Sequence, residues 1–559
     1  MRKFYLCFLM LMLVSVYASS QTKSVMGHIT DENGHAVSFA SVKIKNTKTG
    51  AAADAAGSFV IRANTGDVLL ITATGFNSKE VTVGDDNIIS ISLSSASQEL
   101  TNVVVTTALG IQRQAKDLGY ATTTISNKTL VQGKSVNIQQ ALNGKISGLN
   151  VSTVNSGVME NAKINIRGIR SLTGNNQPML VVDGAPTPLG YLSSIPPDDV
   201  QTLTVLKSAA SAAIYGPDAV NGVIIINTKR GGKTPTVTIS STLEATKVSF
   251  FPKLQKDFGA GAGEVADPYG NYGYVPYENQ QYGPHFDGTI KPLGIPLQDG
   301  SIQMVPYSND HYKDKIKFWN TGLTLQNSAS ITGEDFYVSM EDAKIQGLVP
   351  DDVNRRTSLR FNGGKKYGAF SINYGLNYIL QNYDVVNEAG FGATQPGAYA
   401  GGLFFLVMQI PSNVPLLNYK DWQNSKFAQY SNYYDEFAVN PYWLIGNVRS
   451  RGREDDIIGN LEASYKFLPW LTATARLSSN LAFQNTTNTN APVVVTDWAI
   501  NIAKRNGTQY SNRPGLVGTD ENYASRINLD YFLSGDDNIT KDFSLKYIAG
   551  SSIRQNRAK

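Results

Sequence analysis

The sequence has little charge and a single cysteine. Asp, Glu, Lys and Arg make up 17% of its 559 residues, against roughly 25% in typical soluble domains. The one cysteine, Cys7, lies within an apolar stretch near the N-terminus. If that stretch is removed by processing, no disulfide, thiolate metal site or cysteine nucleophile is possible.

Long hydrophobic runs and blocks of basic residues are also missing. After the first twenty residues no stretch approaches the ~18 consecutive apolar residues of a transmembrane helix. The net charge of +4 comes from scattered residues, which gives no indication of a nucleic-acid partner. The chain is long enough for several domains, and if it spans a membrane it must use strands.

Residues 1–20 are typical of a secretory signal peptide. Arg2 and Lys3 form a basic start, the following residues to Tyr17 are apolar apart from one serine, and small residues occupy 18–20. This order of segments predicts export and cleavage. Because Cys7 lies inside the apolar stretch and not after it, a lipid-anchored lipoprotein is not expected.

Residues 24–94 alternate in short runs broken by turn residues. Ala40, Val42 and Ile44 point one way while Ser41 and Lys43 point the other, as a half-buried strand requires. We expect a small antiparallel β-sandwich here. Residues 118–232 mix short strands with short helices, which predicts a compact α+β domain.

A hinge over residues 95–117 separates these two domains and contains a β-branched run. The run is Val103, Val104, Val105, Thr106 and Thr107. Such a segment could add itself as a strand to the sheet edge of another protein. The alternative is an edge strand of a neighbouring domain, and the pattern alone leaves both open.

Residues 233–559 repeat segments of about ten alternating residues, which is typical of outer-membrane barrel strands. The clearest segments are 370–378, 460–467, 471–478 and 526–533. Charged residues should face the lumen, because a charge facing lipid at mid-bilayer costs about 2–4 kcal/mol. A soluble sandwich would give the same alternation with the faces exchanged. About nine strands are expected, too few for a 22-stranded plugged barrel, so we expect an incomplete barrel from a fragment or a truncated gene product.

Several ordered motifs resemble the SusC/RagA family of TonB-linked outer-membrane proteins. They are Gly27–Asp31 and Asp54–Phe59 in the first domain, then Ala141–Leu149, Ile166–Gly168, Val181–Gly184 and Leu206–Ile224 in the second. The resemblance covers the chain after the signal and implies a mainly β protein. Its parts would be a carboxypeptidase-regulatory-like sandwich, an α+β plug and an antiparallel transmembrane barrel. One departure is Pro217-Asp218, where the family more often has Ser/Thr-Arg.

The resemblance implies TonB-dependent import of an oligosaccharide or peptide across the bacterial outer membrane. The implied partners are TonB, which would grip residues 103–107 and displace the plug, a SusD-like surface lipoprotein, and outer-membrane lipid. A TonB-linked receptor, signal transducer or adhesin without import, and a non-functional truncated copy, are the alternatives.

Two further groups of residues are candidates for function. Arg167 and Arg170 flank a plug strand and are interpreted as plug anchors, which would need carboxylates from the barrel wall if buried. A Tyr-rich loop is a candidate ligand site, because Tyr offers a flat face and a hydroxyl at low entropic cost. Its residues are Tyr269, Tyr272, Tyr274, Tyr277, Tyr282 and Phe286. A packed extracellular loop is the equal alternative.

No catalytic, metal or cofactor site is expected. Gly133-Lys134-Ser135 and Gly232-Lys233-Thr234 lack the preceding glycine of a phosphate loop. The four histidines include no pair spaced as in a zinc protease motif. An enzyme is therefore not the expected class.

Overall fold

The computed structural model describes most of the chain. The described residues are 22–32, 34–47, 49–94, 104–106, 112–114, 122–153, 157–159, 162–207, 211–212, 215–262, 273–388, 402–505, 511–540 and 543–559. The expected signal peptide therefore lies outside them. The chain divides into two compact units, Met1–Val104 and Val105–Lys559.

The N-terminal unit is a β-sandwich. Its strands are β1 (Lys23–Asp31), β2 (Ser41–Ile44), β3 (Gly50–Ala52), β4 (Ser58–Ala63), β5 (Val68–Thr72), β6 (Lys79–Thr82) and β7 (Ile88–Leu93). One sheet has the order β4-β1-β7 and the other β3-β2-β5-β6. Alternate residues of β4 are buried, as the sequence pattern predicts.

One pairing in this unit differs from the expected antiparallel arrangement. β1 and β7, the first and last strands, pair in parallel, with Met26 opposite Ile88 and Ile29 opposite Ile91. Alternation of apolar residues fixes which face a residue takes, but it carries no information about the direction of the neighbouring strand. The prediction of a sandwich is confirmed, and the prediction that it is wholly antiparallel is wrong.

The second unit begins with a short pair of strands and the α+β domain, which we call the plug. β8 (Val104–Thr106) pairs with β9 (Gln112–Gln114). The plug sheet has the order β10-β15-β16-β13-β14, and β11 pairs with β12 separately. The strands are β10 (Thr122–Ser126), β11 (Leu149–Thr153), β12 (Ala162–Ile166), β13 (Met179–Val182), β14 (Ala185–Thr187), β15 (Val200–Leu206) and β16 (Val223–Thr228).

Short helices cover the plug sheet. They are α2 (Asn127–Leu130), η3 (Val131–Gly133), α3 (Ile138–Ala141), η4 (Leu189–Ser194), η5 (Pro197–Asp199) and η6 (Pro217–Ala219). The side chain of Asn137 accepts from the Gln139 backbone N–H at 2.8 Å and so caps α3, a position where Asn is a preferred residue.

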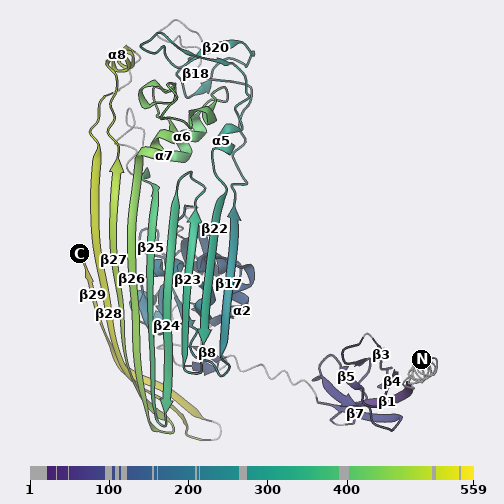
Figure 1. Cartoon of the computed structure of the whole chain (residues 1–559). Coiled ribbons are helices and arrows are strands. Elements are labelled where there is room, and N and C mark those ends of the chain that lie inside the picture. Colours follow the sequence, from purple (N-terminus) through teal and green to yellow (C-terminus); the bar gives the residue numbers. More distant parts are fainter. Residues whose placement is uncertain are drawn as a thin grey trace, which may run out of the picture. The chain divides into compact units, whose positions relative to one another are not determined.

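A large antiparallel sheet of nine strands follows the plug (Figure 1). Its strands are β17 (Thr236–Thr246), β22 (Gly322–Thr332), β23 (Phe336–Gln346), β24 (Val353–Tyr367), β25 (Phe370–Val386), β26 (Val448–Leu468), β27 (Leu471–Asn490), β28 (Leu516–Asn538) and β29 (Ser544–Ala558). Each expected segment lies within one of these strands, and the observed strands are longer than the alternating segments that predicted them.

The two faces of this sheet have opposite polarity. Leu461, Leu477 and Leu529 are paired in one row across three strands and are 47%, 48% and 40% exposed. In the next row Arg476 and Asp530 are 2% and 3% exposed. In these rows the apolar side chains thus face outward, while the charged side chains are buried. A water-soluble sandwich requires the reverse, so its pattern is excluded for this sheet. The expectation that charged residues face the lumen fails elsewhere in the sheet, because the ion pairs Arg355–Asp342 and Arg453–Asp455 lie on the outward face.

The connections at one end of the sheet fold into a layer of their own, which we call the loop layer (Figure 1). It contains β18 (Gly261–Ala262), β19 (Gln281–Tyr282), β20 (Ile290–Leu293), β21 (Gln303–Pro306), α5 (Asp314–Lys317), α6 (Leu403–Gln409), η8 (Leu416–Tyr419), η9 (Tyr430–Asn432), α7 (Pro441–Asn447) and α8 (Asp497–Arg505). A core of buried residues that includes Val407, Leu444 and Val495 holds these connections together.

No helix in the described part of the chain is long and apolar enough to cross a membrane.

Candidate functional site

The plug is joined to the sheet by a buried ion pair. Asp199 ends η5, and its two carboxylate oxygens accept from different strands: Arg360 Nε of β24 at 2.9 Å and Tyr337 Oη of β23 at 2.8 Å. The side chains of Arg360 and Asp199 are 3% and 4% exposed. Buried charges are tolerated only when they are paired in this way, so this contact holds the plug against the wall at one defined point.

A second link uses the turn between β13 and β14. Asp183 Oδ1 and Oδ2 accept from the backbone N–H and the hydroxyl of Thr228 at 2.9 and 2.6 Å. Asn362 of β24 in turn donates to the Thr228 hydroxyl at 2.7 Å. At the same turn Gly184 has φ +85°, and its carbonyl accepts from Arg476 Nη1 at 3.2 Å. A Cβ on Gly184 would lie 2.5 Å from that nitrogen, which explains why the Val-Val-Asp-Gly motif ends in glycine.

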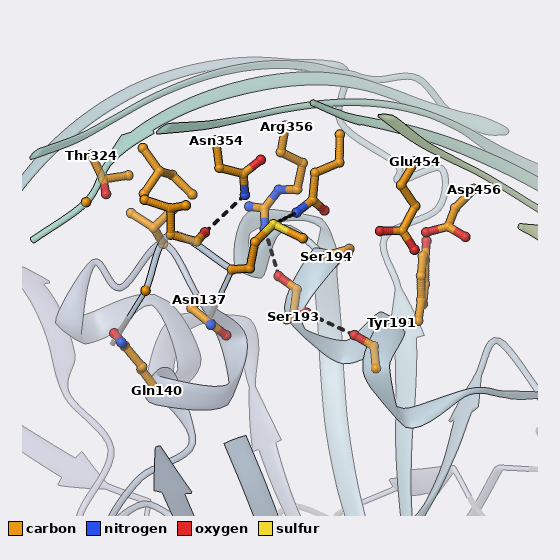
Figure 2. Close-up of a pocket in the computed structure, with 18 of the residues that line it drawn as sticks. Asn137, Gln140, Tyr191, Ser193, Ser194, Thr324, Asn354, Arg356, Glu454 and Asp456 are labelled. Carbon is orange, nitrogen blue, oxygen red and sulfur yellow. Dashed lines mark hydrogen bonds between the residues drawn. The ribbon is translucent and has the colours of Figure 1, made fainter. Parts of the chain in front are cut away.

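A cavity of about 650 Å³ lies between the plug and the polar face of the sheet (Figure 2). On the wall side, Asn354 Nδ2 donates to the Val158 carbonyl at 3.0 Å and Arg356 Nη1 donates to the Ser193 carbonyl at 2.7 Å. Burial raises the pKa of Tyr191, which lines the plug side, to about 12. Both the plug and the sheet therefore contribute polar groups to the cavity, among apolar residues such as Val136, Ile345 and Leu348.

These contacts were missed by reasoning from the sequence. Asp199 and Arg360 carry no local motif of their own, and the motif that contains Asp183 does not indicate its partners. Asp199 and Arg360 are 161 positions apart, and Asn362 is 134 positions from the Thr228 that joins it to Asp183. The only available signal is the placement of polar residues on the inward side of the strands, which marks a whole face and not particular residues.

The predicted anchors, Arg167 and Arg170, are both exposed. Arg167 adopts φ 60° immediately after β12. Arg170 Nη1 donates to the Val220 carbonyl at 3.1 Å, within the plug itself. Their anchoring role stays a prediction, while the contacts through Asp199 and Asp183 are present in the structure.

The residues of the predicted aromatic loop differ in their exposure to solvent. Tyr274 and Tyr277 are buried, Tyr282 is 72% exposed, and Tyr269 and Tyr272 lie outside the described residues. The Tyr274 ring packs edge-on against the buried Tyr307, with the centroids 5.0 Å apart. Burial raises the pKa of both phenols.

The same group includes Phe286, which packs against Tyr307 at 5.0 Å. These rings form a small cluster of their own within the loop layer, so of the described candidates Tyr282 is the one displayed to solvent. Its role in ligand binding stays a prediction.

The predicted TonB-binding segment is only partly described. Val104, Val105 and Thr106 form β8, while Val103 and Thr107 lie outside the described residues. Its pairing with β9 occurs within the hinge that precedes the plug. The main chain of this segment thus adopts the extended form that strand addition needs.

Lys315 is a buried cation of the loop layer with a testable pH effect. It is 2% exposed, and its Nζ donates to the Met408 carbonyl at 2.8 Å. Burial lowers its pKa to about 8. Between about pH 8 and 10 the unfolded chain therefore holds a proton that the folded chain has lost, so stability rises with pH in this window.

We expect the free energy of unfolding of the loop layer to rise by about 2 kcal/mol from pH 8 to pH 10 relative to Lys315→Met, at about 1.4 kcal/mol per pH unit and per proton. Hydrogen exchange of α6 in both chains, corrected for the intrinsic exchange rate, measures this difference. Parallel pH profiles for the two chains would contradict the effect of burial.

Among the described residues no group of three or more His, Cys, Asp or Glu side chains is placed to hold a metal ion.

Comparison with known proteins gives two domain matches. Residues 114–223 match the TonB-dependent Receptor Plug Domain, and residues 25–105 match the CarboxypepD_reg-like domain. The second match covers the N-terminal sandwich and the first covers most of the plug.

The chain is also similar to curated proteins over most of its length. It is 27% identical to the TonB-dependent receptor SusC of Bacteroides thetaiotaomicron over 500 residues, which are 84% of this chain and 45% of that protein. A TonB-dependent receptor of Formosa agariphila is 29% identical over 483 residues, or 83% of this chain and 42% of that protein. The chain thus spans less than half the length of these relatives.

A solved structure titled as the RagAB peptide importer in its open-open state shares the fold. It aligns with a TM-score of 0.62 at 18% identity, over 81% of this chain and 49% of that chain. The two domain matches, the curated relatives and the shared fold agree with the motifs in the sequence. Together they support the SusC/RagA family of TonB-dependent receptors as the family that this chain resembles.

Proposed function

We propose that the protein takes part in TonB-dependent import of a bulky nutrient, an oligosaccharide or a peptide, across the bacterial outer membrane. The observation that carries this proposal is the polarity of the nine-stranded sheet. Rows of Leu side chains face outward, and Arg476 and Asp530 are buried beneath the plug. A wall with an apolar outside and a polar, plugged inside suits a gated passage through lipid.

The structure supports a route by which a pull on residues 103–107 would reach the plug. The hinge leads directly into β10, which lies at the edge of the plug sheet and pairs with β15. Asp199 immediately precedes β15 and holds the wall through Arg360. Tension on the hinge would therefore act first on the β10–β15 pair and then on this ion pair.

The proposed partners follow from the relatives. TonB would bind the β8 segment by strand addition, and a SusD-like lipoprotein would cover the loop layer from outside. We place the protein in the outer membrane after removal of the signal peptide, with its apolar face against lipid. In this arrangement the cargo would be captured at the loop layer, and TonB would supply energy at the hinge.

The proposal is tested by one substitution in β8. Val105→Pro removes a backbone donor that strand addition needs, so uptake should fall to the level of a strain lacking TonB. Val105→Thr keeps β propensity and should import normally. The measurement is depletion of fluorescent casein peptides and of malto-oligosaccharides by cells expressing each chain. Uptake of either probe by Val105→Pro at the wild-type rate would refute energised import.

A further inference from the structure

The cavity between plug and wall carries an unbalanced charge. Glu454 and Asp456 of β26 line it (Figure 2), and two residues apart on one strand they face the same side about 7 Å from each other. No ion pair joins either one to a Lys or Arg among the described residues. Among the described residues, the cation that lines the cavity is Arg356. Its Nη2 pairs with Glu341 Oε1 at 2.9 Å, and this pair neutralises its charge.

A second observation points to a ligand at the same place. Asn354 and Arg356 are 4% and 6% exposed, yet Asn354 Oδ1 and Arg356 Nε have no hydrogen-bond partner. One atom is an acceptor and the other a donor, and an unmade hydrogen bond on such a buried atom costs about 1–3 kcal/mol. Both atoms are shielded from solvent, so a ligand reaches them only after the groups packed over them move.

Strand register fixes the distance between the two carboxylates and the two buried atoms without a partner. Arg356, Gln381 and Glu454 pair in one row across β24, β25 and β26, so the first and last lie two strand spacings, about 10 Å, apart. A ligand that pairs with the carboxylates and with the two buried atoms must present a cation to Glu454 and Asp456. It must also present an adjoining donor and acceptor to Asn354 and Arg356.

We propose that this cavity binds a basic peptide. The ammonium or guanidinium of a Lys or Arg side chain lies between Glu454 and Asp456, and a neighbouring peptide group donates to Asn354 Oδ1 and accepts from Arg356 Nε. A neutral sugar would pair with the amide and the guanidinium but leave the two carboxylates repelling each other. A metal ion would find only these two carboxylates. The inference deepens the proposed import function by naming the charge of the cargo.

The test is equilibrium binding to the full chain in detergent micelles, with trilysine as the probe. The matched ligand is trilysine acetylated on its side-chain amines and N-terminus, which keeps the peptide groups and removes the cations. Maltotriose and calcium chloride are the other probes. We expect trilysine to bind about tenfold or more tightly than the acetylated peptide, because charge-assisted hydrogen bonds are lost on acetylation. Maltotriose and calcium should compete weakly.

Substitutions in β26 distinguish the face that lines the cavity from the outward face of the strand. The double variant Glu454→Gln, Asp456→Asn should lose the preference for trilysine. Asp455 lies between them on the outward side, where it pairs with Arg453 at 2.8 Å, so Asp455→Asn should keep the preference. If the double variant does not fold, the comparison of trilysine with the acetylated peptide on the wild-type chain still tests the proposal.

Equal binding of both peptides, tighter binding of maltotriose or calcium, or an unchanged preference in the folded double variant would each overturn the proposal. These results are independent of TonB. Binding of trilysine without TonB-dependent uptake would support this site and overturn the proposed import function. TonB-dependent uptake without a preference for charged peptides would support import and overturn this site.

Discussion

Arg360→Ala is expected to loosen the plug from the wall and to destabilise the protein by about 3–5 kcal/mol, because it leaves a buried carboxylate without its cation. The Asp199 carboxylate would keep the hydrogen bond from Tyr337 at 2.8 Å. The loss should appear as a lower midpoint of guanidinium unfolding in micelles. In cells it should appear as greater sensitivity to vancomycin, which is too large to pass a seated plug.

The same strand offers a matched control for this prediction. Arg355 pairs with Asp342 at 2.9 Å, but it points to the opposite face and its side chain is 65% exposed. Arg355→Ala should therefore cost less than about 1 kcal/mol, as exposed ion pairs do, and should leave vancomycin excluded. Equal effects of the two substitutions would show that the buried pair does not hold the plug.

Asn440→Ala is expected to cost about 3 kcal/mol in the loop layer. Its Oδ1 accepts from the Tyr442 N–H at 3.0 Å and caps α7, while its Nδ2 donates to the Tyr419 and Ala428 carbonyls at 2.9 and 2.8 Å. The side chain is fully buried, so no water replaces it. Loss of the cap contributes about 1 kcal/mol, and each carbonyl left without a donor contributes at least about 1 kcal/mol.

Hydrogen exchange of residues 402–447 measures this change, because the nine-stranded sheet should retain its protection. Asn447→Ala is the control. Asn447 is the same residue type at the other end of α7 and is half-buried, and its Nδ2 donates to the Trp443 carbonyl at 2.8 Å. Its cost should be within about 1 kcal/mol. Exchange that rises equally in both variants would mean that Asn440 does not organise the layer.

The strands were predictable, and their limits were not. Alternation over 370–378 and 471–478 located β25 and β27, yet these strands run to Val386 and Asn490. Their extensions contain consecutive polar residues such as Asn485–Asn490, which give no period-two signal. Pairing with a neighbouring strand in register keeps such residues extended when their own pattern would not.

The candidate site was less predictable than the fold. Alternation assigns Glu454 and Asp456 to one face of β26, but it cannot show that Arg356 is already neutralised by Glu341 or that Asn354 meets Val158. The Tyr-rich loop drew attention because aromatic residues are visible in a sequence. Packing of Tyr274 against Tyr307 is a property of the folded loop layer.

The sequence by itself determined the class of this protein. Period-two alternation, ordered turn motifs and the lack of long apolar runs are local properties of the chain, so a sandwich, a plug and a wall of alternating strands can be inferred from it. The tertiary structure decided which way the wall faces and which polar residues meet across the plug. Those contacts join residues such as Asp199 and Arg360, 161 positions apart, and their energy comes from burial that exists only after the plug and sheet have packed together.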